Sequence, residues 1–296
     1  ALLKAGAVKL PLNDMLTEDE FEYMLADSRA STVIAGATFV DTLDSLADRV
    51  DTLERPIGTD DPEDLPDGFE ALATLEAEGD ETVAPDVDLS PADPAGHFYT
   101  GGTTGDPKGV VHSHDNFVTN VYSHVIELDL TGEETLLLMT PLPHSAGAFL
   151  WASYLVGATS VIRPGFDPEQ ALDDIEERGV TWTFLVPTMV YALLDHPALE
   201  DTDTDSLETL VYGAAPMTPA RLKEGIEAFG TAFVQFYGQT EVPNLITTLG
   251  KAEHRIAIER GEEQRLSSAG QPCLMADVKI AAPETGDEVP RGEEGE

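Results

Sequence analysis

Cysteine, positive charge and long apolar runs are all scarce in this 296-residue sequence. The one cysteine, Cys273, excludes an internal disulfide and a cysteine-based metal cluster, and it fits a reducing cytoplasm. Lys4 and Lys9 flank only a brief apolar stretch, so no secretory signal peptide is predicted. The longest apolar run, at residues 146–162, is shorter than the roughly 18 residues of a membrane span. We interpret it as a buried helix at 146–156 followed by a buried strand at 158–162.

Negative charge dominates the chain. Sixteen Lys and Arg stand against 56 Asp and Glu, a formal net charge of −40 at pH 7. Such a field disfavours nucleic acid and anionic membranes as partners. The acidic residues are scattered through every segment, which indicates adaptation to molar salt, where the Debye length falls to roughly 3 Å. We therefore predict a halophilic, globular, cytoplasmic protein, and the sequence carries no signal for its oligomeric state.

Short β-branched runs alternate with capped amphipathic helices, and no period of 20–50 residues repeats. Helix starts are indicated by the capping-box pair Thr17 and Glu20, by Asp167, and by Thr218. Strands are expected at residues 31–35, 97–100, 134–139, 158–162, 180–186, 208–212 and 231–236. This alternation predicts an α/β fold with mostly parallel sheets covered by helices.

Three subdomains are predicted along the chain. Residues 1–124 and 125–250 read as two packed, mostly parallel α/β subdomains. After residue 250 the helical signals thin, Gly and Pro increase, and a short β run appears at 277–281. We interpret 251–296 as the start of a smaller β element that the chain does not finish, and both ends of the chain look cut.

Polar loops follow five of the expected strands, at residues 100–108, 141–144, 187–188, 213–217 and 237–241. In open α/β sheets, ligands bind beyond the carboxyl ends of the strands. Gly and Pro are also common in ordinary strand–helix turns, which is the simpler interpretation of any single loop. Five such loops together favour a ligand site.

The loop at 99–110, with sequence YTGGTTGDPKGV, has the chemistry of a phosphate-binding loop. Glycines let backbone N–H groups approach an anion closely, and hydroxyls add donors. Lys108 adds a positive charge in a chain that has few. The residues expected to bind ATP here are Thr100, Gly101, Gly102, Thr103, Thr104, Gly105 and Lys108. The loop is not a Walker A motif, because Pro107 precedes the Lys and Gly109 follows it in place of Ser or Thr. The Rossmann fingerprint is absent as well.

A second set of functional residues is predicted at 237–241 (YGQTE). Tyr237 offers a ring face to adenine, Thr240 a hydroxyl to the α-phosphate, and Glu241 a hard oxygen ligand to Mg²⁺. Taken alone, an aromatic such as Tyr237 is more commonly a core residue. Glu241 is open to a role as a first-turn helix carboxylate.

These segments together resemble the adenylate-forming (AMP-binding) superfamily, which holds acyl-CoA synthetases, luciferase-like enzymes and peptide-synthetase adenylation domains. The resemblance is carried by 99–110 and 237–241, the two signature loops, and by residues 6–13 (GAVKLPLN). Residues 213–217 (GAAPM) are similar to the adenine-side loop, and 140–144 (TPLPH) to the segment beside the activated carboxylate. Gly101 stands where the family commonly has Ser.

The resemblance implies the large N-terminal domain of an acyl-CoA synthetase-like ligase, in which residues 251–296 are the incomplete start of a small β-barrel. Its substrates would be a carboxylic acid, ATP with Mg²⁺, and coenzyme A. It assigns catalytic roles to Lys108, Thr104, Glu241 and His144, with Glu241 as the metal ligand. Further ATP contacts are expected from Gly213, Ala214, Ala215, Pro216, Tyr237, Gly238, Gln239 and Thr240. The family's ribose-binding Asp and catalytic Lys are not found, so the chain alone is expected to be inactive or very weak.

Two other functions fit the same motifs. A peptide-synthetase-type domain would activate an amino acid for a carrier protein, but such pockets usually place an Asp, and 231–236 holds no acidic residue. A non-catalytic, nucleotide-binding relative is the other, and Lys108 and Glu241 argue against decay. His112, His114 and His124 are not interpreted as metal ligands, because no acidic residue joins them at ligand spacing.

Overall fold

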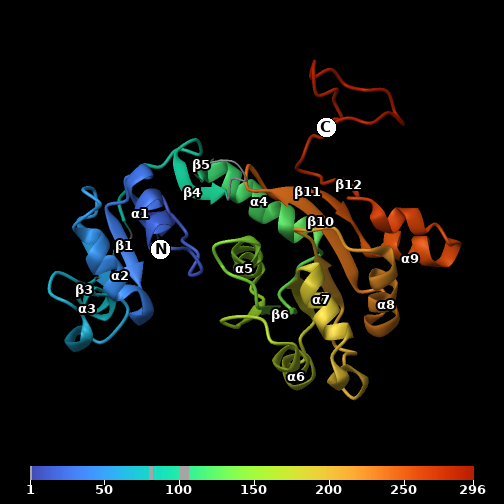
Figure 1. Cartoon of the computed structure of the whole chain (residues 1–296), viewed down its shortest axis with the longest axis horizontal. Coiled ribbons are helices and arrows are strands. Elements are labelled where there is room, and N and C mark those ends of the chain that lie inside the picture. The colour runs from blue at the N-terminus through green and yellow to red at the C-terminus, as the bar shows by residue number, and fades with distance from the viewer. Residues whose placement is uncertain (1, 80–82, 84, 101–106) are drawn as a thin grey trace. The chain divides into compact units, whose positions relative to one another are not determined.

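The structure is a computed structural model that describes residues 2–79, 83, 85–100 and 107–296. It contains two compact units, Ala1–Phe117 and Val118–Glu296. Helices and mostly parallel strands alternate through both, which confirms the predicted α/β class (Figure 1). The subdomain borders at residues 124 and 250, and the barrel after residue 250, stay predictions.

The first unit contains a small parallel sheet with the order β1-β2-β3. Its elements are α1 (Glu18–Asp27), β1 (Thr32–Ala35), α2 (Ala37–Ala47), β2 (Arg55–Gly58), β3 (Glu70–Ala71) and α3 (Leu72–Glu78), with 3-10 turns η1 (Leu2–Ala5) and η2 (Pro62–Asp64). The predicted capping box of α1 is present, because Thr17 and Glu20 each bond the other's backbone N–H. Phe21 and Leu25 of α1 pack with Leu43 and Leu46 of α2 beside the sheet.

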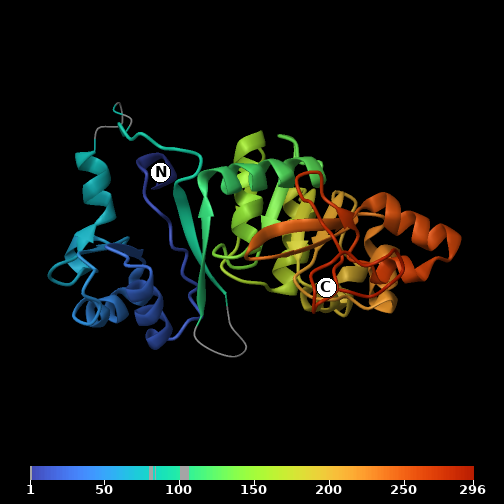
Figure 2. The ribbon, with the colours of Figure 1, turned by 90° about the horizontal axis from the view of Figure 1, so that it is seen from above.

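A separate antiparallel hairpin carries the two ends of the predicted phosphate loop (Figure 2). β4 (Pro94–Thr100) pairs with β5 (Lys108–Ser113), and Thr100 lies opposite Lys108. The expectation that 100–108 leaves a strand of the parallel sheet is therefore wrong. Thr100 instead ends one strand of this two-stranded hairpin and Lys108 begins the other.

The second unit is built on a seven-stranded sheet with the order β12-β11-β10-β9-β8-β6-β7. β6 to β10 run parallel, whereas β11 and β12 are antiparallel to their neighbours. The strands are β6 (Thr135–Leu138), β7 (Thr159–Ile162), β8 (Trp182–Leu185), β9 (Thr209–Tyr212), β10 (Phe233–Gln239), β11 (Val242–Leu249) and β12 (Gln271–Pro272). The helices are α4 (His114–Glu127), α5 (Ser145–Val156), α6 (Pro168–Arg178), α7 (Pro187–Leu194), α8 (Pro219–Phe229) and α9 (Lys251–Arg260), with η3 (Pro197–Glu200) and η4 (Glu263–Ser267).

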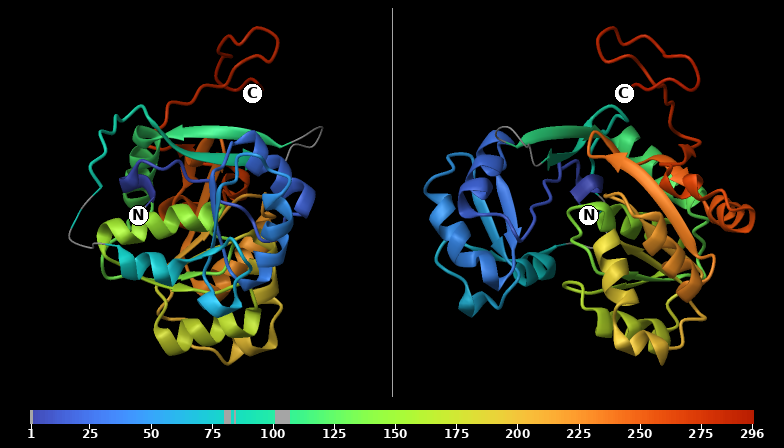
Figure 3. Two further views of the ribbon diagram at one scale, coloured as in Figure 1. Left: turned by 90° about the vertical axis from the view of Figure 1, so that its left-hand side faces the viewer. Right: turned by 45° about the vertical axis from the view of Figure 1, so that its right-hand side comes forward.

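Helices cover both faces of this sheet, and each face has its own core (Figure 3). Helices α6 to α9 pack on one face, where Leu137 of β6 points. The C-terminal end of α4 and helix α5 cover the other face, where Leu136 and Leu138 point. Since alternate residues of each central strand enter different cores, β8 and β9 are buried throughout.

Two expected β segments differ from the structure. The apolar run at 146–162 does split into a helix, α5, and a strand, β7, but β7 is an edge strand whose residues are exposed or half-buried. The run at 277–281 forms an isolated bridge between Ala281 and Glu288 and no strand. Among the described residues, none of the helices combines the length and the apolar character that crossing a bilayer requires.

Asp174 of α6 is a buried carboxylate held by two arginines. Its side chain is 2% exposed, and it accepts two bonds from Arg163, at 2.7 and 2.6 Å, and one from Arg178, at 2.7 Å. The hydrogen bonds from Arg163, followed by those from Arg178, hold the pKa of Asp174 below its usual value. The pair ties the end of β7 to α6.

Candidate functional site

Four of the predicted polar loops share one edge of the seven-stranded sheet. Strands β6, β8, β9 and β10 run parallel, so their carboxyl ends lie on the same side. Residues 139–144, 186–187, 213–217 and 240–241 follow these ends directly. The adjacency of β9 and β10 places the two predicted adenine-side loops next to each other, as the sequence indicated.

Strand β10 extends beyond β9 at this edge. The last β9–β10 pair is Tyr212 with Gln235, so residues 236–239 project past it. Gly213 lies against this projection, and a Cβ added there would come within 2.6 Å of the Phe236 carbonyl oxygen. The Tyr237 side chain is 47% exposed. A role for Tyr237 as a core aromatic is therefore wrong, and its ring is accessible to a flat ligand.

Glu241 lies in the two-residue turn between β10 and β11, so it is not a first-turn helix carboxylate. Gln239 pairs with Val242 across this turn, and the register shifts at Gly238. A Cβ at Gly238 would lie 2.1 Å from the Asn244 carbonyl oxygen, which explains the glycine. Glu241 is exposed at the tip, with Thr240 beside it. An exposed carboxylate beside a hydroxyl is a donor set that suits a hard cation.

His144 is the N-terminal flanking residue of α5 and is exposed. Its backbone N–H donates to the Pro141 carbonyl at 3.1 Å, which closes the turn after β6. Ser145 begins α5 and donates from its hydroxyl to Asn244 Oδ1 at 3.2 Å. The β6–α5 loop and the β10–β11 hairpin are thus joined directly.

Helix α4 supplies a second set of bonds to the same hairpin. Asn120 donates from Nδ2 to the Pro243 carbonyl at 2.5 Å. His124, fully buried, lies 3.4 Å through Nε2 from Asn244 Nδ2. Burial lowers the pKa of His124 to about 4, and its bond to the Asn120 carbonyl offsets part of this effect. No sequence motif indicates the contact between His124 and Asn244, since the two residues are 120 positions apart.

The base of the phosphate-loop hairpin is fixed by Tyr99. Its hydroxyl donates to Asp27 Oδ2 at 2.6 Å, and burial together with this bond raises its pKa. A Cβ at Gly109 would lie 3.1 Å from the Tyr99 ring, so glycine allows the ring to cover the opposite strand. Lys108 is exposed, and Thr100 is half-buried. Gly101, Gly102, Thr103, Thr104 and Gly105 lie outside the described residues.

His112 belongs to strand β5 of this hairpin and packs against β4. His112 is buried with its ring against Phe98, at 5.4 Å between centroids. Among the described residues, no three His, Cys, Asp or Glu side chains converge on one point.

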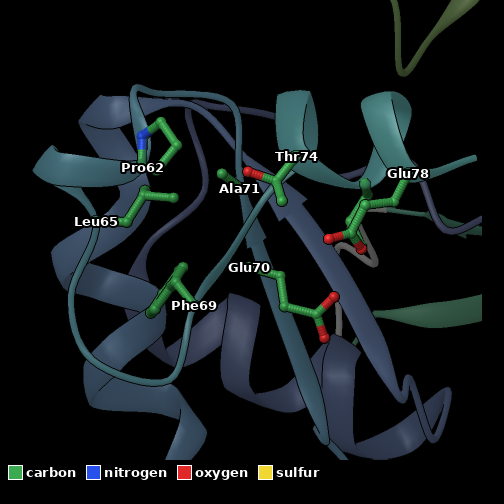
Figure 4. Close-up of a pocket in the computed structure, with 8 residues that line it drawn as sticks. Pro62, Leu65, Phe69, Glu70, Ala71, Thr74 and Glu78 are labelled. Carbon is green, nitrogen blue, oxygen red and sulfur yellow. The ribbon is translucent and has the colours of Figure 1, made fainter.

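A pocket of about 320 Å³ lies elsewhere in the first unit, between η2, β3 and α3 (Figure 4). Leu65 and Phe69 line it together with Glu70, which forms a two-bond ion pair with Arg55. None of the residues predicted to bind substrate lines this pocket.

Comparison with known proteins places these loops in a family context. A model of the AMP-binding enzyme family matches residues 1–296. The chain is 39% identical over 280 residues to the medium/long-chain-fatty-acid–CoA ligase FadD8 of Mycobacterium tuberculosis, covering 93% of this chain and 47% of that protein. It is 35% identical over 299 residues to a feruloyl-CoA synthase of Amycolatopsis, covering 99% and 54%.

A solved structure, the amide bond synthetase McbA from Marinactinospora thermotolerans, matches the fold with a TM-score of 0.87. It is 26% identical, and the match covers 99% of this chain and 56% of that one. The chain therefore spans about half the length of the curated relatives it matches. Since the family model matches every residue, the chain belongs to the AMP-binding enzyme family.

Proposed function

We propose that the protein containing this chain activates a carboxylic acid with ATP and transfers the acyl group to coenzyme A. The observation that carries this proposal is the placement of residues 213–217 and 237–241 side by side at the carboxyl edge of the sheet. An accessible aromatic ring, small residues that leave room for a base, and an exposed carboxylate meet there. The family match supports the same chemistry.

The reaction has two steps. A carboxylate oxygen attacks the α-phosphorus of ATP, the bond to the β-phosphate oxygen breaks, and acyl-AMP and pyrophosphate form. The coenzyme A thiol, losing its proton, then attacks the acyl carbon, and AMP leaves with the bonding electrons. Adenylation is needed because a carboxylate oxygen is a poor leaving group. The main barrier is electrostatic, since one anion approaches another.

The chain's residues would lower this barrier by holding charge in place. Lys108 and the backbone amides of the loop at 101–106 would bind the departing phosphates, with hydroxyls from Thr100, Thr103 and Thr104. Tyr237 would stack on adenine, and the small residues of the neighbouring loop, Gly213, Ala214, Ala215 and Pro216, would lie beside the base. Gly238 and Gln239, which follow Tyr237 in β10, would also contact the nucleotide. Thr240 would donate to the α-phosphate, and His144 would lie beside the acid. Glu241 would hold Mg²⁺ together with the ATP phosphates, and the ion would neutralise the negative charge that builds up there. Mg²⁺ is usually bound in this way, by one or two carboxylates and by substrate phosphate oxygens.

A plain acyl or aryl acid is the proposed substrate. The fatty-acid and feruloyl ligases are relatives of this kind. Amino-acid activation would call for an acidic residue near the adenine-side loops, and β10 holds none. We therefore favour coenzyme A as the acceptor.

Substitution of Lys108 tests this function. In the full-length natural protein that contains this chain, acid-dependent exchange between ATP and pyrophosphate is measured in high KCl against a panel of carboxylic acids. Lys108→Ala should lower the exchange rate at least about 100-fold, because a charge-stabilising donor is lost. Lys279→Ala is the matched control, since Lys279 is exposed and its ammonium donates to the Gly286 carbonyl, away from the predicted nucleotide-binding loops in the chain. Exchange that survives Lys108→Ala, or that no acid elicits in the wild type, would contradict the proposal.

A further inference from the structure

Asn244 has a strained backbone and a side-chain amide whose oxygen and nitrogen are both hydrogen-bonded. Its φ is 61°, in the left-handed region, although it belongs to β11. Within the described part of the chain, only four residues other than glycine have positive φ, and Ala214 in the neighbouring loop is another. Asn tolerates this region better than most residues, but strain of this kind persists only where the surroundings enforce it. Here it lies opposite the register shift at Gly238.

The hydrogen bonds around the Asn244 amide have only one consistent polarity. His124 Nδ1 lies 2.7 Å from the Asn120 carbonyl, which can only accept, so Nδ1 carries the proton. His124 Nε2 must then accept, and Asn244 Nδ2 donates to it. This leaves Asn244 Oδ1 as the acceptor for the Ser145 hydroxyl. The amide orientation is therefore fixed by a helix on each side.

Both helices hold the segment immediately after the hairpin tip. Asn120 and His124 of α4 bond Pro243 and Asn244, and Ser145 of α5 bonds Asn244. Glu241 is only three residues before Asn244, and His144 directly precedes Ser145. The amide thus couples the turn bearing the proposed metal ligand to the loop bearing the proposed acid-side residue.

We propose that Asn244 is a positioning residue that sets the place of Thr240 and Glu241 relative to His144 through its bonds to His124 and Ser145. The inference rests on the proposed function, and it assigns a role to a residue that no signature motif contains. Asn244 acts by holding the hairpin and does not touch the reacting atoms.

The test separates this role from a general loss of stability. In the full-length natural protein, Asn244→Gly keeps a residue that accepts positive φ but removes the amide. Thr183→Val is the matched control, because Thr183 also donates a buried bond, to the Leu137 carbonyl at 2.9 Å in the same sheet. Glu241→Gln is the benchmark for direct loss of the metal ligand. Exchange rates, the Michaelis constant for MgATP and the Mg²⁺ concentration for half-maximal exchange are measured alongside the melting temperature.

Asn244→Gly should lower kcat/KM for MgATP by on the order of 10–100-fold and raise the Mg²⁺ requirement in the same direction as Glu241→Gln. Thr183→Val should change neither by more than about threefold at a similar loss of melting temperature. Equal kinetic effects of Asn244→Gly and Thr183→Val, in a wild type that does exchange, would overturn this inference alone. A wild type without exchange would overturn the proposed function and this inference together.

A second measurement follows the hydrogen-bond polarity itself. Asn244→Asp places a carboxylate against His124 Nε2, so it should raise the pKa of His124 well above about 4. Nitrogen-15 spectra of the histidines across pH report this shift and the Nδ1–H tautomer. An unchanged His124 titration would overturn the inferred contact. If Asn244→Gly does not fold, Ser145→Ala, which removes only the donor to Oδ1, carries the same kinetic comparison with a smaller expected effect.

Discussion

Histidines 124 and 254 share one hydrogen-bond arrangement. Each donates from Nδ1 to the carbonyl four residues earlier in its own helix, at 2.7 Å to Asn120 and 2.8 Å to Gly250. Each accepts at Nε2, from Asn244 and from the Tyr212 hydroxyl respectively. Burial lowers the pKa of both rings. A buried neutral histidine with a fixed tautomer is a rigid connector between helix and strand.

The neutrality of His124 predicts a pH-dependent stability. Its pKa of about 4 in the folded state lies below the ordinary value of 6.5, so the unfolded chain binds more protons between these values. The free energy of unfolding should therefore fall as pH decreases from 6.5 to 4, by up to about 3 kcal/mol from this residue. Urea unfolding of wild type and His124→Gln over this range measures the difference, and the variant should show the shallower slope.

Asn120→Ala is the control for this experiment. It removes the bond to the Pro243 carbonyl without removing a titratable group. It should lower stability at every pH and leave the slope as in the wild type. A His124→Gln slope equal to that of the wild type would contradict the prediction.

Local patterns at single residues could be predicted from the sequence. The Thr17–Glu20 box formed as expected, and α6, whose start at Asp167 was also expected, ends at Gly179 with φ of 60°. Each depends on residues within one helical turn. The bonds of Asn244 to His124 and Ser145 could not be predicted, because they depend on which helices cover the sheet. The sequence offers only one indication of these bonds: Asn244 follows Pro243 directly, just after the glycine-containing segment 237–241.

Strands and loops at the scale of elements were predicted well where burial is two-sided. The expected strands at 180–186 and 208–212 contain β8 and β9, whose residues are all buried. The strand expected at 158–162 formed as β7, but it is an edge strand and is not buried. The run at 277–281 forms no strand, since β-branched residues indicate a preference for pairing and not the presence of a partner. The strand expected at 97–100 formed as part of β4, whereas its antiparallel pairing with β5 was not predicted.

The close contact between the β9–α8 loop and β10 gives a prediction for Gly213. In Gly213→Ala the new Cβ would lie 2.6 Å from the Phe236 carbonyl oxygen and 2.8 Å from its ring, so the two segments must separate. We expect a loss of about 1–3 kcal/mol in the free energy of unfolding. Nucleotide affinity should fall as well, because Tyr237 would move away from residues 213–217.

Gly165→Ala is the matched control, since nothing lies within 4 Å of its added Cβ. Its urea unfolding midpoint should be unchanged or slightly raised. If Gly213→Ala leaves both stability and nucleotide affinity unaltered, the close contact between Gly213 and Phe236 is not present.

At the scale of the whole molecule, the formal charge of −40 gives a prediction about salt. Self-repulsion at low ionic strength should destabilise the folded chain, and screening shortens the Debye length from about 10 Å at 0.1 M to about 3 Å at 1 M. The melting temperature should therefore rise by on the order of 10 °C over this range of KCl.

Calorimetry or circular dichroism in KCl and, separately, in NaCl checks this prediction. A screening effect depends on ionic strength and so should be the same for both salts. A melting temperature that stays constant or falls with salt would contradict adaptation to molar salt. The chain by itself, which spans about half of its relatives, is expected to show little or no exchange activity even at the best salt concentration.

The family could be identified from the sequence because its signature loops are contiguous in the chain. The net charge of −40 could also be obtained from the sequence alone, since it is a sum over residues and does not depend on the fold. The division into two units at Phe117 had no comparable signal, because helix α4 continues across it without a break in pattern.

The projection of β10 past β9 also limits which lengths of chain are tolerated at this edge. Each residue of an antiparallel strand adds about 3.4 Å. Deleting one residue from each arm would turn Tyr237 toward the opposite face, and deleting two would restore its direction but retract the tip by about 7 Å. Homologous proteins should therefore differ at positions 237–241 by substitution. Insertions and deletions should collect in loops such as 201–205, whose length does not set the position of a predicted binding residue.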